Sequence, residues 1–193
     1  MTSLRCRTRG PRAPNRRPTT GPESPPWTPS QVVASSPGDL WLLIGAPGEG
    51  RSTLLTSIAG HLAREHRLQT YLVSTRDPAR VVSGRLHANE TGIPLGHILE
   101  YRLTSVAEER LSRCTQKLSA LPLHLAAGPY ARHRAADDLP SLARAEPIVA
   151  MFDDPDWETE WNLRDARHLA DSGAAVVAAL PRERLLYDTA AAS

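Results

Sequence analysis

The chain has 193 residues, of which 40% are hydrophobic and 23% are charged, and this composition is typical of one modest globular domain. The longest apolar runs, residues 40–44 and 174–180, are far shorter than the ~20 residues that a membrane-spanning helix needs. The two cysteines, Cys6 and Cys114, lie far apart in the sequence and show no metal-ligand spacing. We therefore exclude a transmembrane span and a disulfide framework, and we expect a cytoplasmic protein.

The formal net charge of +2 conceals an asymmetry along the chain. Residues 1–36 contain six arginines, a single glutamate and seven prolines, whereas the remaining residues carry a small excess of acids. This segment shows almost no periodic apolar pattern, so it cannot bury enough surface to offset the entropy that ordering would cost. We predict a disordered N-terminal arm over residues 1–36. Such an arm either contacts the phosphates of a nucleic acid or is a solvated tail without a partner.

From residue 37 onward, short apolar runs alternate with helical patterns, an order typical of a parallel sheet covered by crossover helices. Strands are expected at 39–46, 71–74, 123–126, 147–152 and 174–180. Helices are expected at 51–66, 77–89, 105–121, 138–144 and 162–171. We predict an α/β domain over residues 37–184, with a mainly parallel five-stranded sheet and helices on both faces. A flexible C-terminal tail is expected over 185–193.

Two of the expected helices begin with capping signals. Asp77 precedes a proline, and this pair is typical of an N-cap followed by the first helical turn. Ser105 is followed three residues later by Glu108, which is the spacing of a capping box. Cys114 falls on the apolar face of the second of these helices, so we interpret it as a core residue.

A glycine-rich loop closes the first expected strand and opens the first expected helix, which is the placement required of a phosphate-binding loop. Its residues are Gly45, Ala46, Pro47, Gly48, Glu49, Gly50, Arg51 and Ser52. Glycines allow consecutive backbone N–H groups to turn onto phosphates, and the helix N-terminus adds its positive dipole end. The usual pattern has lysine where this chain has Arg51, so a simple glycine-rich turn is the alternative interpretation.

A second feature supports the phosphate-binding interpretation. The apolar strand expected at 147–152 is followed by Asp153, and ligands of open α/β sheets bind at the carboxyl ends of the strands. This is the Walker B arrangement, in which the carboxylate holds Mg²⁺ largely through water. We predict that Ser52 and Asp153 are the metal ligands, with Asp154 as the substitute if the strand register differs by one residue.

With these motifs in place, residues 37–184 resemble the C-terminal ATPase domain of the DnaB-type replicative helicases, which is a RecA-like P-loop NTPase domain. The resemblance includes the middle of the chain as well as the loop. The matching residues are Pro37, Gly38, Asp39, Leu40, Pro47, Val82, Arg85, Leu86, Ala88, Leu103, Thr104, Glu109, Arg110, Leu111, Leu118, Ser119, Pro122, Leu123, Val176, Val177 and Ala178. The resemblance implies ATP or ADP with Mg²⁺ as the bound cofactors, the phosphates being held by residues 45–52.

The departures from the family pattern fall on catalytic positions. Arg51 replaces the family's P-loop lysine, Arg76 replaces its catalytic glutamate, and Pro181 replaces a glutamine after the fifth strand. A guanidinium cannot accept a proton from water, and Asp77, next to Arg76, is the nearest candidate base. The family's arginine finger lies in a segment beyond the residues that match. The resemblance therefore predicts a nucleotide-binding domain whose hydrolysis is slow or absent.

Two other functions stay open at this point. In the first, the chain is an active DNA-dependent ATPase or DNA helicase of DNA replication, with Arg51 and Asp77 as substitutes and a partner subunit supplying the finger. In the second, it is a non-enzymatic adaptor that docks on a helicase ring. The expected partners are nucleotide, single-stranded DNA through the arginine-rich arm, and a helicase-like ring or further copies of the chain, with no membrane.

Overall fold

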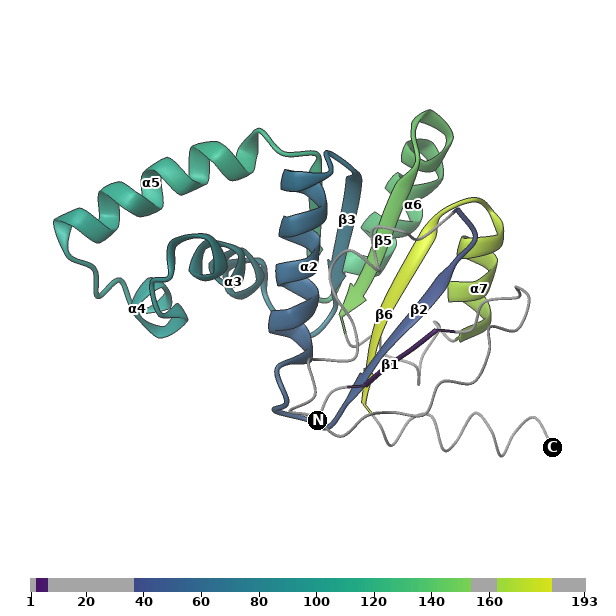
Figure 1. Cartoon of the computed structure of the whole chain (residues 1–193), viewed down its shortest axis with the longest axis horizontal. Helices are drawn as coiled ribbons and strands as arrows, with labels where there is room; N and C mark the ends of the chain where they lie inside the picture. The colour runs from purple at the N-terminus through teal and green to yellow at the C-terminus, as the bar shows by residue number, and fades with distance from the viewer. Residues whose placement is uncertain (1–2, 7–36, 154–162, 182–193) are drawn as a thin grey trace, which may run out of the picture.

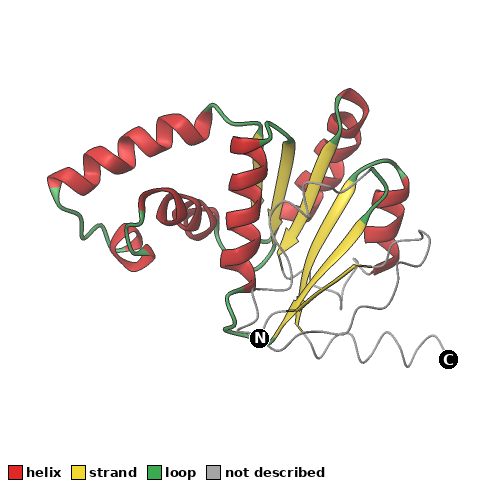
Figure 2. Cartoon of the chain, in the orientation of Figure 1, coloured by secondary structure: helices red, strands yellow, loops and turns green. Residues whose placement is uncertain are grey.

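The computed structural model describes residues 3–6, 37–153 and 163–181, which build one six-stranded sheet between two layers of helices (Figures 1 and 2). The strands follow the order β1-β2-β6-β5-β3-β4 across the sheet. Their bounds are β1 Ser3–Cys6, β2 Leu40–Gly45, β3 Gln69–Ser74, β4 Leu123–Ala127, β5 Ile148–Asp153 and β6 Ala175–Pro181. Five neighbouring strands, β2, β6, β5, β3 and β4, are all parallel, so their carboxyl ends lie along one edge.

The helices divide between the two faces of the sheet. Their bounds are α2 Arg51–Glu65, α3 Ala79–Thr91, α4 Leu95–Leu99, α5 Ser105–Ser119, α6 Ala131–Ala145 and α7 Leu163–Asp171. Helix α2 packs on one face with α3 beside it, whereas α6 and α7 pack on the other (Figure 1). Helix α5 extends away from the sheet, and its main helix contact is with α3. None of the helices in the described ranges is long and apolar enough to cross a membrane.

The core lies on both faces of the sheet because the central strands are buried on both sides. In β6, Val177 faces the cluster formed with α2, whereas Val176 faces the cluster formed with α6 and α7. All six residues of β5 are buried, including Asp153 at its end. A strand buried on both faces has a continuous apolar sequence, which is why the sequence indicates this strand clearly.

The five predicted parallel strands are confirmed, as is the placement of helices on both faces. The structure adds a sixth strand inside the segment predicted as a disordered arm, because Ser3–Cys6 pairs antiparallel with β2. Residues 7–36 and the tail predicted at 185–193 lie outside the described residues.

Several helix boundaries differ from the prediction. Helix α3 begins after Pro78, and Asp77 does not cap it. Helix α5 is capped by the Thr104 hydroxyl, which accepts a hydrogen bond from the Ala107 N–H at 3.3 Å, so the predicted cap at Ser105 is wrong by one residue. Helix α6 starts seven residues earlier than predicted and contains Pro140. Helix α4 was not predicted.

Candidate functional site

The glycine-rich loop occupies the turn between β2 and α2, as the motif predicts. Gly45 is the last residue of β2 and is buried, and α2 begins at Arg51. Gly48 and Gly50 have φ values of 83° and 82°, in the left-handed region that only glycine adopts without strain. Gly50 is the N-cap of α2, and its carbonyl accepts the Leu54 N–H at 2.9 Å. The loop therefore delivers the N-terminus of a fifteen-residue helix to the carboxyl edge of the sheet.

The two predicted metal ligands are in direct contact. The Ser52 hydroxyl donates a hydrogen bond to Asp153 Oδ1 at 2.8 Å, although 101 positions separate the two residues in the sequence. Strand β6 lies between β2 and β5, so the start of α2 must reach across one strand to meet Asp153. Asp153 is only 5% exposed. The fold thus places a hydroxyl and a buried carboxylate side by side, the hard oxygen donors that Mg²⁺ prefers.

Two further residues surround Asp153, and the sequence analysis did not place either of them in the site. Ser74, the last residue of β3, pairs with Asp153 in the sheet, and its hydroxyl lies 3.5 Å from Oδ2. Arg85 Nη1 lies 4.0 Å from the same oxygen and 2.5 Å from Asp77 Oδ2. Two features of the sequence could have indicated these contacts: Ser74 is a polar residue at the end of a strand, and Arg85 follows Asp77 by about two helical turns.

The Arg85 contact explains why Asp77 does not cap α3. The carboxylate accepts a hydrogen bond from the guanidinium, which carries a full positive charge, whereas a backbone N–H would supply only a dipole. Asp77 is therefore held toward Arg85 and Asp153, on the same edge as the loop. The side chains of both Asp77 and Arg85 remain partly accessible, at 31% and 17%.

Glu49 has a position that the motif does not predict. Its carboxylate accepts the Ala46 N–H at 2.9 Å, so it uses one of the backbone donors expected to bind phosphate. The same carboxylate also approaches Gly45, where an added Cβ would lie 3.0 Å from Oε2. An acid inside a phosphate-binding pattern was the signal that could have indicated this contact. The loop thus binds an anionic oxygen, which in this structure is the carboxylate oxygen of Glu49.

Arg51 presents a second indication of an anion site. Its Nη1 is buried and has no hydrogen-bond partner among the residues that the structure describes. Its Cγ and Cδ pack against Gly45, at 3.2 and 3.3 Å from the position of an added Cβ. A buried charged donor without an acceptor costs free energy, and an anion at the loop would remove that cost. The residues present therefore fit a phosphate group beside a magnesium ion.

The remaining predicted residues have the following positions. Arg76 is exposed in the connection that follows β3. Pro181 ends β6 beside Gly45, so its ring lies next to the loop and offers no side-chain amide. Asp154, the alternative metal ligand, lies outside the described residues.

Comparison with known proteins gives a likeness of fold. No protein-family model matches the chain, and no curated protein sequence matches it. Among solved structures, it resembles a DnaB-like replicative helicase described with its interactions with primase, at a TM-score of 0.59 and 14% identity over 74% of this chain and 38% of the other.

A second solved structure, described as an ATPase domain, matches with a TM-score of 0.63 and 15% identity. The match covers 76% of this chain and 58% of the other. The chain thus spans less than two thirds of either structure. Together, the strand order and these matches show that the chain has the RecA-like fold of a DnaB-type helicase ATPase domain.

Proposed function

We propose that this chain binds ATP or ADP together with Mg²⁺ at the loop of residues 45–52 and hydrolyses ATP slowly or not at all. The observation that carries the proposal is the hydrogen bond between Ser52 and the buried Asp153, at the N-terminus of α2. The buried Nη1 of Arg51 supports it, because this donor has no acceptor in the described part of the chain and an anionic ligand would supply one.

Each part of the site has a distinct role in this proposal. Backbone N–H groups of the loop and the N-terminus of α2 bind the phosphates, and Arg51 contributes a fixed positive charge. Ser52 and Asp153 hold the magnesium ion, which neutralises part of the phosphate charge when bound. Arg85 and Ser74 keep the Asp153 carboxylate oriented toward Ser52. Glu49 must release the Ala46 N–H before a phosphate oxygen takes its place.

Slow hydrolysis follows from the residues near the position of the attacking water. By the resemblance, the catalytic glutamate corresponds to Arg76, which cannot act as a base. Asp77 is the neighbouring carboxylate, but its Oδ2 already accepts a hydrogen bond from Arg85 Nη1 at 2.5 Å, so this oxygen is not available to orient an attacking water. We therefore expect steady-state turnover well below ~1 s⁻¹, a value at the low end for enzymes.

The binding proposal is tested by titrating the full chain with a fluorescent ATP analogue, with and without Mg²⁺. We expect magnesium-dependent binding that weakens at least tenfold in Asp153→Asn, which keeps the size of the side chain and removes its charge. Asp171→Asn, an exposed carboxylate on α7, is the matched control and should bind as the unaltered chain does. Binding that does not respond to Mg²⁺ or to Asp153→Asn would contradict the proposal.

The proposal of weak hydrolysis has its own test. Phosphate release is measured for the unaltered chain and for Arg76→Glu, which restores a proton acceptor at the position matched to the catalytic glutamate. We expect little release from the former and an increase of tenfold or more from the latter. Turnover near 1 s⁻¹ in the unaltered chain would instead favour an active ATPase, and stimulation by single-stranded DNA would then be the next measurement.

The biological setting follows from the fold relatives, which are named as a replicative helicase and an ATPase domain. We propose that the chain takes part in DNA replication, in contact with a helicase-like ring or with other copies of itself. The arginine-rich segment 1–36 is proposed to contact single-stranded DNA. Electrophoretic binding at several salt concentrations tests this contact, because phosphate binding weakens steeply as salt rises.

A further inference from the structure

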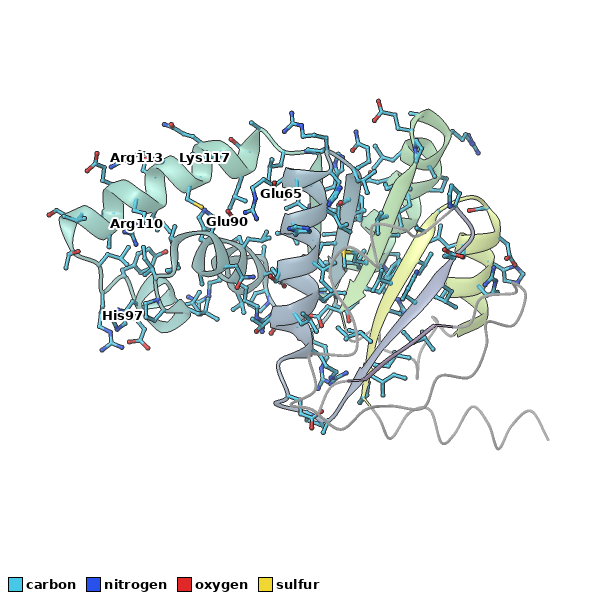
Figure 3. All side chains as sticks on the ribbon, in the orientation of Figure 1. Glu65, Glu90, His97, Arg110, Arg113 and Lys117 are labelled. Carbon is cyan, nitrogen blue, oxygen red and sulfur yellow. The ribbon has the colours of Figure 1, made fainter. Side chains whose placement is uncertain are left out.

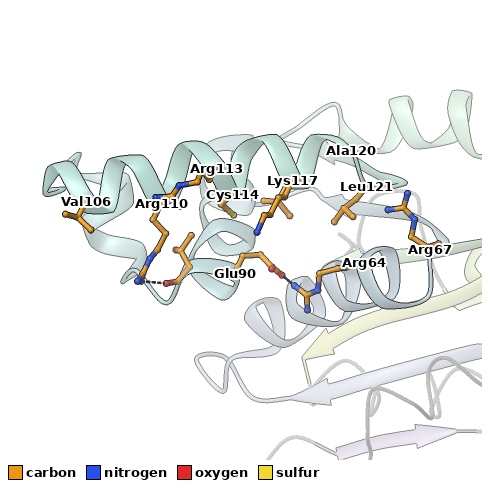
Figure 4. A pocket seen from close by; sticks show the side chains of 12 residues that line it. Arg64, Arg67, Glu90, Val106, Arg110, Arg113, Cys114, Lys117, Ala120 and Leu121 are labelled. Carbon is orange, nitrogen blue, oxygen red and sulfur yellow. Dashed lines mark hydrogen bonds and ion pairs between the residues drawn. The ribbon is translucent and has the colours of Figure 1, made fainter.

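A cavity of about 650 Å³ lies between α5 and the ends of α2 and α3, away from the nucleotide site. Figure 4 shows its walls, and Figure 3 labels Glu90, Arg110, Arg113 and Lys117 of these walls in a view of the whole molecule. Twelve residues line the cavity, and five of them are cations: Arg64, Arg67, Arg110, Arg113 and Lys117. Glu90 is the single carboxylate among the twelve, which leaves a surplus of four positive charges on the walls.

Three of these cations already have partners in the protein. Arg64 pairs with Glu65 and with Glu90, so its charge is compensated at the base of the cavity. Arg110 donates a hydrogen bond to the Thr91 carbonyl at 3.0 Å, which fixes its side chain without neutralising it. Arg113 forms an exposed i,i+4 pair with Glu109 at 2.9 Å, and such pairs contribute little.

The side chains of the other two cations, Arg67 and Lys117, make no hydrogen bond or ion pair within the described parts of the chain. Lys117 comes from α5 and points into the cavity toward Glu90, and Arg67 stands at the end near Leu121 (Figure 4). Two cations from opposite walls are therefore available to a ligand.

The backbone of Arg67 is a second, independent indication. Its φ is 53°, in the left-handed region, at the turn between α2 and β3. An L-residue with a side chain is strained there, and glycine is the usual residue at such a helix exit. Strained backbone is often found at functional positions. The strained Arg67 also lines the cavity, so both observations fall on the same residue.

The walls also limit the kind of anion that fits. A cavity of this volume is of the size that holds small molecules, and its cations without an acidic partner among the described residues, Arg67, Arg110 and Lys117, favour a compact ligand with more than one negative charge. None of the twelve lining residues is aromatic, so the cavity has no surface on which the bases of a nucleic acid could stack. Arginine forks match phosphate oxygens in a bidentate geometry.

From these observations we propose that the cavity between α2, α3 and α5 is a binding site for a small oligophosphate, held chiefly by Arg67 and Lys117. Arg110 and Arg113 add their charge along α5, and Leu118 and Leu121 give the site an apolar side that would contact an organic group carried by the phosphates. The site is separate from the nucleotide loop and does not depend on it.

Cys114 provides a readout inside the cavity. It lines the wall and is 7% exposed, and burial raises the pKa of its thiol, so alkylation by a small reagent is slow and measurable. The only other cysteine is Cys6, so the full chain carrying Cys6→Ser has one thiol. The rate of Cys114 alkylation by iodoacetamide is then measured by mass spectrometry at increasing concentrations of inorganic tripolyphosphate, without Mg²⁺ and at constant ionic strength.

We expect tripolyphosphate to slow alkylation saturably, by fivefold or more. Arg67→Gly should raise the half-protecting concentration at least tenfold while the thermal midpoint stays the same or rises by roughly 2–4 °C, because the strained residue is replaced. Lys117→Ala should weaken protection similarly. Arg80→Ala, an exposed arginine on α3 that does not line the cavity, is the control and should leave protection unchanged.

Absence of protection, or equal protection in Arg67→Gly, would overturn the proposal. Stronger protection by a tetraglutamate peptide than by tripolyphosphate would also overturn it, since the cavity would then be a site for acidic peptides. ATP without Mg²⁺ serves as a second probe. If ATP protects Cys114 at lower concentrations than tripolyphosphate does, the ligand class is an organic phosphate. If ATP protects only at higher concentrations than tripolyphosphate, the ligand class is an inorganic phosphate.

Discussion

At the scale of single residues, Glu49 is the side chain most directly opposed to nucleotide binding. Its carboxylate accepts the Ala46 N–H inside the phosphate-binding loop, so an incoming phosphate must displace an anion that the chain supplies itself. Two like charges within a few ångströms repel one another even with partial screening by solvent. One backbone donor of the loop is therefore already bonded to Glu49. The negative charge of Glu49 weakens the attraction that Arg51 and the N-terminus of α2 exert on a phosphate.

We accordingly expect Glu49→Ala to tighten nucleotide binding by roughly tenfold, which corresponds to about 1.4 kcal/mol. The measurement is the dissociation constant of a fluorescent ATP analogue with Mg²⁺. Glu65→Ala, at the opposite end of α2, removes the same charge away from the loop and should leave affinity unchanged. Weaker binding in Glu49→Ala would mean that this carboxylate supports the loop and does not compete with phosphate.

Tyr71 gives a prediction about pH. Its hydroxyl donates to Asp138 Oδ2 at 2.7 Å, and burial, followed by this hydrogen bond, raises the pKa of the phenol above its ordinary value near 10. A raised pKa means that the folded state favours the protonated form. The stabilising contribution is therefore complete below pH 10 and is lost as pH rises beyond it.

The variant Tyr71→Phe should unfold about 1 kcal/mol more easily at neutral pH, because Asp138 loses its donor. It should also show a smaller loss of stability above pH 10 than the unaltered chain does. Urea unfolding at several pH values measures both effects. Parallel pH profiles for the two proteins would show that ionisation of Tyr71 does not contribute to the loss of stability above pH 10.

At the scale of elements, two glycines in neighbouring helices have opposite surroundings. In α2, an added Cβ at Gly60 would lie 3.6 Å from Leu86 Cδ2, an ordinary contact. In α3, an added Cβ at Gly84 would lie 2.9 Å from Leu95 Cδ1 and 3.3 Å from Leu99 Cδ2. Gly84 thus permits the close approach of α4, whereas Gly60 leaves room for a methyl group.

We predict that Gly60→Ala raises the free energy of unfolding by roughly 0.5–1 kcal/mol, because alanine favours the helix. Gly84→Val should lower it by about 1–3 kcal/mol, because the branched side chain overpacks the contact with α4. Chemical denaturation of both variants provides the comparison. A stabilised Gly84→Val would show that α4 moves aside at little cost.

The elements also show how far the sequence alone can lead. The five parallel strands and the pairing of Ser52 with Asp153 were predictable, since both depend on local patterns placed at strand ends. The capping role expected for Asp77 was wrong because Arg85, eight residues later, supplies a stronger partner.

The early start of α6 was not predicted, and in the structure the burial of Ala131, Ala135 and Leu139 on one face outweighs the cost of Pro140 inside the helix. The cationic cavity was not predictable either, because its walls come from three separate helices.

At the scale of the whole molecule, the sheet and α5 differ in how firmly they are held. The β5 and β6 strands are buried on both faces, whereas Cys114 is the only buried residue of α5. Segments that bury little apolar surface open locally at a lower free energy than the core does. We expect amide hydrogen exchange in α5 to be at least tenfold faster than in β5, as measured by mass spectrometry of peptides from each segment. Equal protection would show that α5 unfolds only with the whole domain.

This placement of α5 has a consequence for the oligophosphate site. Lys117 lies on α5, which buries little apolar surface, whereas Arg67 follows the firmly packed α2, so a ligand bound to both residues requires α5 to be closed. Ligand binding and local folding are then linked, and exchange in α5 slows by the factor 1 + [L]/Kd while exchange in the sheet stays unchanged. The concentration of a small anion would then set how often α5 opens locally while the rest of the domain stays folded.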